Sequence, residues 1–66
     1  MLVTCTASLD NKLRVENLCQ CINILGGKPC VDGYEVKVTY DGNDATAEKF
    51  IELFSHYPTH GIFIIE

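Results

Sequence analysis

Apolar and polar residues alternate most regularly over residues 34–40 of the chain. The apolar positions are Tyr34, Val36, Val38 and Tyr40, and the polar positions between them are Glu35, Lys37 and Thr39. A period of two is typical of a β-strand with one face buried and the other face in water. We therefore predict a strand here and expect the other elements to cover or flank it.

Two further segments also predict strands. Residues 2–7 alternate in the same way, with Val3, Cys5 and Ala7 expected to face inward and Thr4 and Thr6 outward. Residues 61–65 form a short, almost continuous apolar run that we interpret as the last strand.

Apolar residues at helical spacing predict two helices. The first is expected over residues 11–25, where Gly26 and Gly27 provide a stop, and the second from about Asp44–Thr46 to a point before Tyr57-Pro58. The buried stripe of the first helix is expected to be Val15, Leu18, Cys19, Ile22 and Leu25, and that of the second Ala47, Phe50, Ile51 and Phe54. The element order is then β-α-β-β-α-β.

The position of the hairpin is open, because the central strand has an Asp-Gly pair at each end. If Asp32-Gly33 forms the turn, residues 28–31 are a short strand, which Pro29 places at an edge of the sheet. If Asp41-Gly42 forms the turn, residues 43–46 are a short returning strand. Either choice gives a single α+β domain over residues 1–66, an open-faced sandwich with two helices on one face of a mainly antiparallel sheet.

Composition and charge limit the classes of function that we expect. The net charge is −4 and the pI is near 4.9, and the five basic residues are scattered, so we expect neither a nucleic-acid nor a membrane-surface partner. No apolar run approaches the ~20 residues that span a bilayer. The N-terminus lacks the features of a signal peptide, so we expect a cytoplasmic protein whose four cysteines are reduced.

Several local motifs resemble the HPr family of phosphocarrier proteins. Residues 3–7, 36–42, 45–51 and 59–64 resemble that family's first strand, second strand with its turn, second helix and approach to the fourth strand, and Leu13-Arg14 falls where its active-site loop meets the first helix. The resemblance implies an open-faced β-α-β-β-α-β sandwich. It would also imply phosphate transfer on a histidine two residues before an arginine.

The residues required for that chemistry differ here. Lys12 stands two residues before Arg14, and Val15 comes after the arginine where the family has proline. The family's regulatory serine would fall at about Lys49. We therefore expect an HPr-like domain that does not transfer phosphate. The alternative architecture is a minimal ferredoxin-like sandwich with its hairpin at Asp32-Gly33, a fold that hosts regulatory modules binding small ligands.

Other candidate chemistry is weak. Cys19 and Cys21 lie two residues apart on a predicted helix and would point in different directions, so they are not expected to chelate one ion. His56 and His60 have a spacing found in zinc sites, but no pair of cysteines accompanies them. We expect no metal, no cofactor and no catalytic residues.

The expected surface offers more candidates for function than these motifs do. We expect a protein partner or a second copy of the chain to contact the outer face of the sheet, with two apolar residues of the first helix as further candidates. These partner-contact candidates are Thr4, Thr6, Leu13, Ile24, Glu35, Lys37, Thr39 and Phe63. The function expected is a small non-catalytic domain acting through protein–protein contact. The alternatives are a ferredoxin-like regulatory module that binds a small ligand, and a small acidic inhibitor, of the kind that phages encode, that occupies a basic site.

Overall fold

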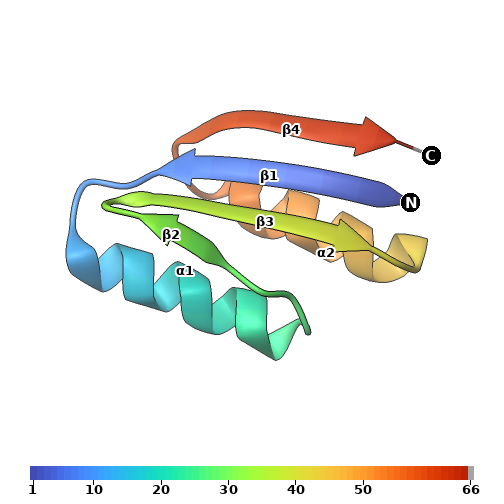
Figure 1. Ribbon diagram of the computed structural model, residues 1–66, viewed down its shortest axis with the longest axis horizontal. Helices are drawn as coiled ribbons and strands as arrows, with labels where there is room; N and C mark the ends of the chain where they lie inside the picture. The colour runs from blue at the N-terminus through green and yellow to red at the C-terminus, as the bar shows by residue number, and fades with distance from the viewer. Residues whose placement is uncertain (66) are drawn as a thin grey trace.

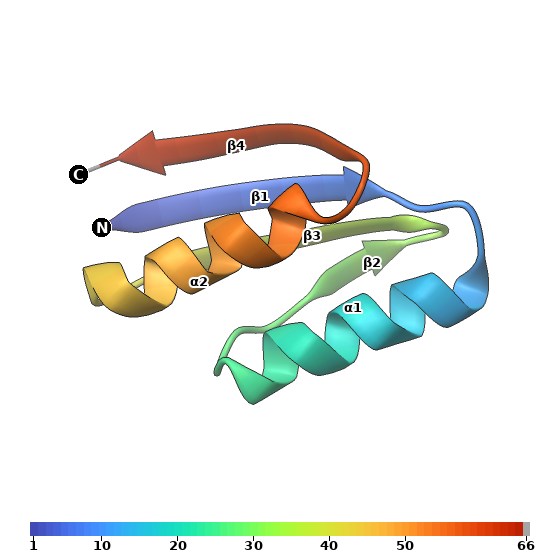
Figure 2. The same ribbon diagram turned by 180° about the vertical axis from the view of Figure 1, so that it is seen from behind.

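A computed structural model describes residues 1–65 of the chain, which fold into one four-stranded sheet with two helices packed on one of its faces (Figures 1 and 2). The elements in chain order are β1 (Leu2–Ser8), α1 (Lys12–Ile24), β2 (Cys30–Asp32), β3 (Glu35–Asp41), α2 (Asp44–Ser55) and β4 (Thr59–Ile65). The predicted α+β sandwich with the order β-α-β-β-α-β is confirmed.

The strands lie in the order β2-β3-β1-β4, and every neighbouring pair is antiparallel. β1 occupies the centre of the sheet between β3 and β4, while β2 and β4 form the two edges (Figure 1). Both helices cover the same face, as Figure 2 shows from behind, and the opposite face carries no covering element of residues 1–65. We call this second face the outer face.

The core lies between the sheet and the helices. The inward positions of β1 and β3 are buried as their alternation predicted, except that Tyr40 is half-buried. The largest buried side chains come from both helices and include Phe50, Phe54, Leu18 and Ile22. The ring of Tyr40 packs against Phe50 with 5.1 Å between centroids. Cys19, Leu25 and Ile51, which were expected on the buried stripes, are half-buried at the margin of this core.

The hairpin lies at Asp32-Gly33, which joins β2 to β3. Gly33 has a φ of +63°, whereas Tyr34 has a negative φ, so the turn is of type II′, with the glycine at its first central position. Tyr34 is therefore a turn residue with an exposed side chain, and the prediction that it begins the buried face of the strand is wrong. The short strand before the turn is an edge strand, as Pro29 predicted.

The second Asp-Gly pair leads into a helix instead of a returning strand. The side-chain oxygen of Asn43 accepts a hydrogen bond from the backbone N–H of Thr46 at 2.8 Å, so α2 begins at Asp44 and residues 43–46 form no strand. Asn11 caps α1 in the same way by accepting from the N–H of Arg14 at 2.9 Å. The hairpin at Asp32-Gly33 is the arrangement expected of the ferredoxin-like version of the fold.

Candidate functional site

The outer face of the sheet is assembled by the register of its strands. Thr4 of β1 lies between Thr39 of β3 and Phe63 of β4, and the next row of the same face holds Lys37, Thr6 and Gly61. Glu35 lies in the row after that, opposite Ser8. Six of the eight predicted contact residues therefore lie on one continuous surface: Thr4, Thr6, Glu35, Lys37, Thr39 and Phe63.

The two halves of this face differ in chemistry. Over β1 and β3 it is polar, and the hydroxyl groups of Thr4 and Thr39 lie 3.3 Å apart across the strands, within hydrogen-bond distance. Over β4 it is apolar, because Phe63 and Ile65 expose 69% and 63% of their surfaces. Leu2, half-buried beside Ile65, extends the apolar side. We call Leu2, Phe63 and Ile65 the apolar margin.

A shallow hollow of about 420 Å³ lies between the two halves and is lined by Thr6, Glu35, Gly61 and Phe63. It exists because Gly61 places no side chain beside Thr6 in its row. A Cβ atom on Gly61 would lie 3.2 Å from a ring carbon of Phe63, so the aromatic ring leans over the glycine. The hollow thus has an aromatic wall on one side and a carboxylate on the other.

The charges of the outer face are mostly negative. Asp32, Glu35 and Asp41 point outward from β2 and β3, and Lys37 is the ammonium group set among them. All of them are exposed, and Asp32 lies directly opposite Glu35 in the β2–β3 ladder. Neighbouring carboxylates in water repel each other weakly. Because their charges are negative, they would attract a basic group that approached this end of the face.

The two remaining candidates lie elsewhere. Leu13 and Ile24 are exposed, by 65% and 78%, at opposite ends of α1, which packs on the other face of the sheet (Figure 2). They do not join the surface formed by the strands. The structure therefore brings six candidates together and separates these two from them and from each other.

Two residues contribute to the site although the sequence did not single them out. Ile65 belongs to the apolar margin and Asp32 to the acidic end, and both can be assigned from the alternation of sides once the register is known. The apolar run over residues 61–65 hid the distinction between the two faces of β4, since its side chains look alike in sequence.

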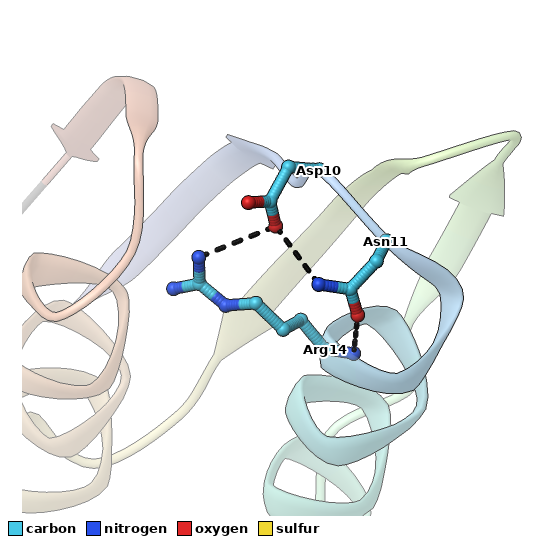
Figure 3. A network of polar contacts seen from close by, with 3 residues as sticks. All are labelled: Asp10, Asn11 and Arg14. Atoms are coloured by element: carbon cyan, nitrogen blue, oxygen red, sulfur yellow. Dashed lines mark hydrogen bonds and ion pairs between the residues drawn. The ribbon is translucent and has the colours of Figure 1, made fainter.

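The loop that would correspond to a phosphocarrier site is occupied by structural contacts (Figure 3). A guanidinium nitrogen of Arg14 lies 3.3 Å from a carboxylate oxygen of Asp10, which also accepts a hydrogen bond from the side chain of Asn11 at 3.2 Å. The same guanidinium lies 5.4 Å from the ring centroid of Tyr57 in the loop between α2 and β4. Lys12 is exposed at the first position of α1.

The thiols are dispersed. Cys5 is buried in β1, and burial raises the pKa of its thiol to about 11. Cys19 packs against the core, and burial raises the pKa of its thiol too, whereas Cys30 is exposed on β2. Among the side chains that the structure describes, which exclude His60, no three from His, Cys, Asp or Glu are placed to hold one metal ion.

The histidines give no further geometry. His56 is exposed at the C-cap of α2. The side chain of His60 lies outside the part of the chain that is described, so the pairing of the two histidines is not tested. A second hollow, of about 300 Å³, lies near His56 and is lined also by Leu25, Lys49, Glu52 and Leu53.

Comparison of the chain with models of protein families, with curated proteins and with solved structures finds no match. The resemblance to the HPr family stays a prediction. None of the helices in the described range is long and apolar enough to cross a membrane.

Proposed function

We propose that the protein is a small non-catalytic interaction domain that binds a protein partner with the outer face of its sheet. The observation that carries this proposal is the uncovered face itself, where Phe63 and Ile65 expose apolar surface in adjacent outward positions of one strand. Exposed apolar surface rimmed by polar groups is typical of a contact site in a soluble protein. The proposal includes no phosphate transfer by Lys12, which takes the place of the family's histidine.

The chemistry of the face defines the partner. The hollow over Gly61 accepts one apolar side chain, which would contact the ring of Phe63. Glu35 forms the other wall, and Asp32 lies beside it, so a Lys or Arg next to that apolar residue would find a complementary charge. The partner we propose is a protein segment with an apolar residue close to a basic one.

The proposal also places the protein in the cytoplasm. All four cysteines are free, and Cys30 is exposed on an edge strand, an arrangement that suits a reducing compartment.

The test uses a random peptide library displayed on a carrier and panned against the protein. We expect enrichment of peptides that combine an apolar residue with Lys or Arg, and binding that weakens as salt rises. Glu35→Lys should lower their affinity at least about tenfold, which corresponds to about 1.4 kcal/mol. Phe63→Thr should weaken binding as well, through loss of the aromatic wall.

The matched control is Glu48→Lys, which makes the same charge change at an exposed position of α2 on the other side of the molecule. It should leave the affinity unchanged. A panning experiment without such enrichment, or ligands that bind equally well to the protein and to both outer-face variants, would refute the proposal.

A further inference from the structure

The two edges of the sheet are unequal. β2 has three residues, comes after Pro29 and ends at the exposed Asp32, and these are features by which proteins protect an edge strand from pairing. β4 has seven residues and contains no Asp, Glu, Lys, Arg or Pro. Long apolar edge strands without such protection pair readily with another strand.

The hydrogen bonds of the sheet identify which groups of β4 are free to pair. Met1 and Gly42 exchange backbone hydrogen bonds at 3.0 and 3.2 Å, and Leu9 donates to Tyr34 at 2.8 Å. Odd-numbered residues of β1 therefore bond to β3. Even-numbered residues must then bond to β4, because successive backbone groups of a strand point to opposite sides. Ser8, which donates to Pro58 at 2.9 Å, agrees with this.

The register carries this rule across to β4. Thr4 lies opposite Phe63 and Thr6 opposite Gly61, so Phe63 and Gly61 direct their N–H and C=O groups to β1, up to the register shift that follows Thr6. The N–H and C=O groups of Ile62 and Ile64 consequently point away from the sheet, along its open edge.

The side chains of β4 are exposed on both sides of the sheet. Phe63 and Ile65 are exposed on the outer face, and Ile64 is 50% exposed on the side that the helices cover. A partner lying on the outer face would leave Ile64 in water. A strand added to the edge would bring its own side chains alongside both faces at once.

We infer that a second copy of the chain pairs with this edge, β4 against β4 in antiparallel orientation, to form one continuous sheet. In a two-fold pair centred on Phe63, Ile62 of each copy lies opposite Ile64 of the other, and these residues exchange hydrogen bonds while the two Phe63 rings face each other. The apolar side chains of each copy meet apolar side chains on both faces of the joined sheet.

Charge on the strand itself does not oppose a second copy at this edge. A chain with a net charge of −4 repels itself over most of its surface, but neither of two β4 strands would bring a carboxylate within residues 59–65 against the other. The pairing is also closed, because each copy has one unprotected edge and the contact uses both. The product is a dimer and not a fibre.

The contact rests on backbone hydrogen bonds of Ile62 and Ile64, which the proposed outer-face site does not use. In this register Ile65 of the second copy lies opposite Gly61, at the margin of the hollow. Sedimentation and native mass spectrometry of the full chain, from micromolar to millimolar concentration, should show a dimer. Ile64→Pro removes an N–H group on the open edge that no strand within residues 1–65 uses. It should raise the dissociation constant of the dimer about a hundredfold. The causes are the loss of one hydrogen bond per copy and the added bulk of the proline ring.

Ile64→Ala is the matched control, because it shortens the same side chain but keeps the N–H group; it should weaken the dimer less than the proline variant does. Hydrogen exchange of the unaltered protein provides a measurement that needs no variant. The amides of Ile62 and Ile64 should become protected as concentration rises, while the amide of Phe63, bonded within the monomer, is protected throughout.

A chain that stays monomeric over this range, or edge amides that exchange equally fast at every concentration, would overturn the inference. So would a dimer that Ile64→Pro leaves intact. Peptide binding that depends on Glu35 in a monomeric protein would sustain the proposed function and refute only the pairing. A dimer at high concentration, together with a diluted, monomeric protein that binds no such peptide, would do the reverse.

Discussion

The guanidinium of Arg14 lies 5.4 Å from the ring centroid of Tyr57, and this contact ties the start of α1 to the loop that precedes β4. The two residues are far apart in sequence, and no strand pairing joins their segments. Asp10 also holds the guanidinium, with 3.3 Å between its carboxylate oxygen and a guanidinium nitrogen (Figure 3). Arg14 is thus a structural residue that connects the start of α1 to the loop between α2 and β4 at one end of the sheet.

Removing the arginine should loosen this end. Arg14→Met keeps most of the aliphatic stem but loses the charge, and we expect the free energy of unfolding to fall by about 0.5–1 kcal/mol. In a domain of this size, 1 kcal/mol corresponds to a Tm decrease of about 4–8 °C. A double-mutant cycle with Tyr57→Leu should give a coupling energy of about 0.5 kcal/mol, and strict additivity of the two changes would contradict the contact.

Gly27 allows the loop after α1 to pass close to the core. A Cβ atom at this position would lie 2.8 Å from the ring of Phe50 and 3.0 Å from Ile22. Gly27→Ala should therefore destabilise the protein by about 1–3 kcal/mol through overpacking, as measured by urea unfolding.

A second substitution separates this cause from a general effect of glycine loss. Phe50→Leu makes room for the added methyl group, so Gly27→Ala should cost less in that background than in the unaltered protein. An equal cost in both backgrounds would show that the ring of Phe50 is not what excludes the side chain.

Gly33 is required by the conformation of the hairpin. Its φ of +63° is unfavourable for a residue with a Cβ atom, while the space around it is open. Gly33→Ala should lower the free energy of unfolding by about 1 kcal/mol, and Gly33→Asn by less, because asparagine tolerates the left-handed region better. Thermal unfolding monitored by circular dichroism would detect the order Gly, Asn, Ala. A variant with alanine as stable as the original would rule out this turn geometry.

The fold was largely predictable because its central elements have regular periods. β1 and β3 alternate strictly, and Phe50 and Phe54 mark the buried side of α2 without ambiguity. The choice between the two Asp-Gly pairs was not predictable from turn propensity, because both satisfy it. The residues next along the chain make the difference, since Asn43 caps a helix, whereas the residues after Gly33 continue as a strand.

Two residues show where local pattern fails. Tyr34 continues the alternating pattern of β3, but it is part of the two-residue turn, so its side chain is exposed to water. Leu9 lies in a polar turn and is nevertheless buried, held by a hydrogen bond from its N–H to the carbonyl of Tyr34. Both outcomes depend on strand pairing between distant segments, which alternation along one segment does not encode.

The sequence predicted which side of the sheet the site residues occupy, but it did not predict how they are arranged around the hollow. Alternation assigned Thr6, Glu35 and Phe63 to the outer side of the sheet. Their convergence around Gly61 depends on the register of β1 with both β3 and β4, and hence on the strand order. The unequal edges likewise became visible only once β4 was known to lie at the end of the sheet.

The buried thiol of Cys5 makes stability depend on pH in the alkaline range. Burial raises the pKa of this thiol from 9.0 to about 11 in the folded protein, while the unfolded chain releases the proton near 9.0. Between these values the unfolded state binds fewer protons than the folded state, so stability is fully retained below pH 9 and falls as the pH rises towards 11. The full effect is about 2.7 kcal/mol, from 1.36 kcal/mol per pKa unit.

Urea unfolding at several pH values between 8 and 11, under reducing conditions, would measure this loss for the unaltered protein and for two variants. Cys5→Ala should be less stable at pH 8, because it leaves a small cavity, but its stability should decline less steeply above pH 9. Cys30→Ser changes an exposed thiol and should retain the original slope. Equal slopes in the two variants would show that ionisation of Cys5 does not drive the alkaline unfolding.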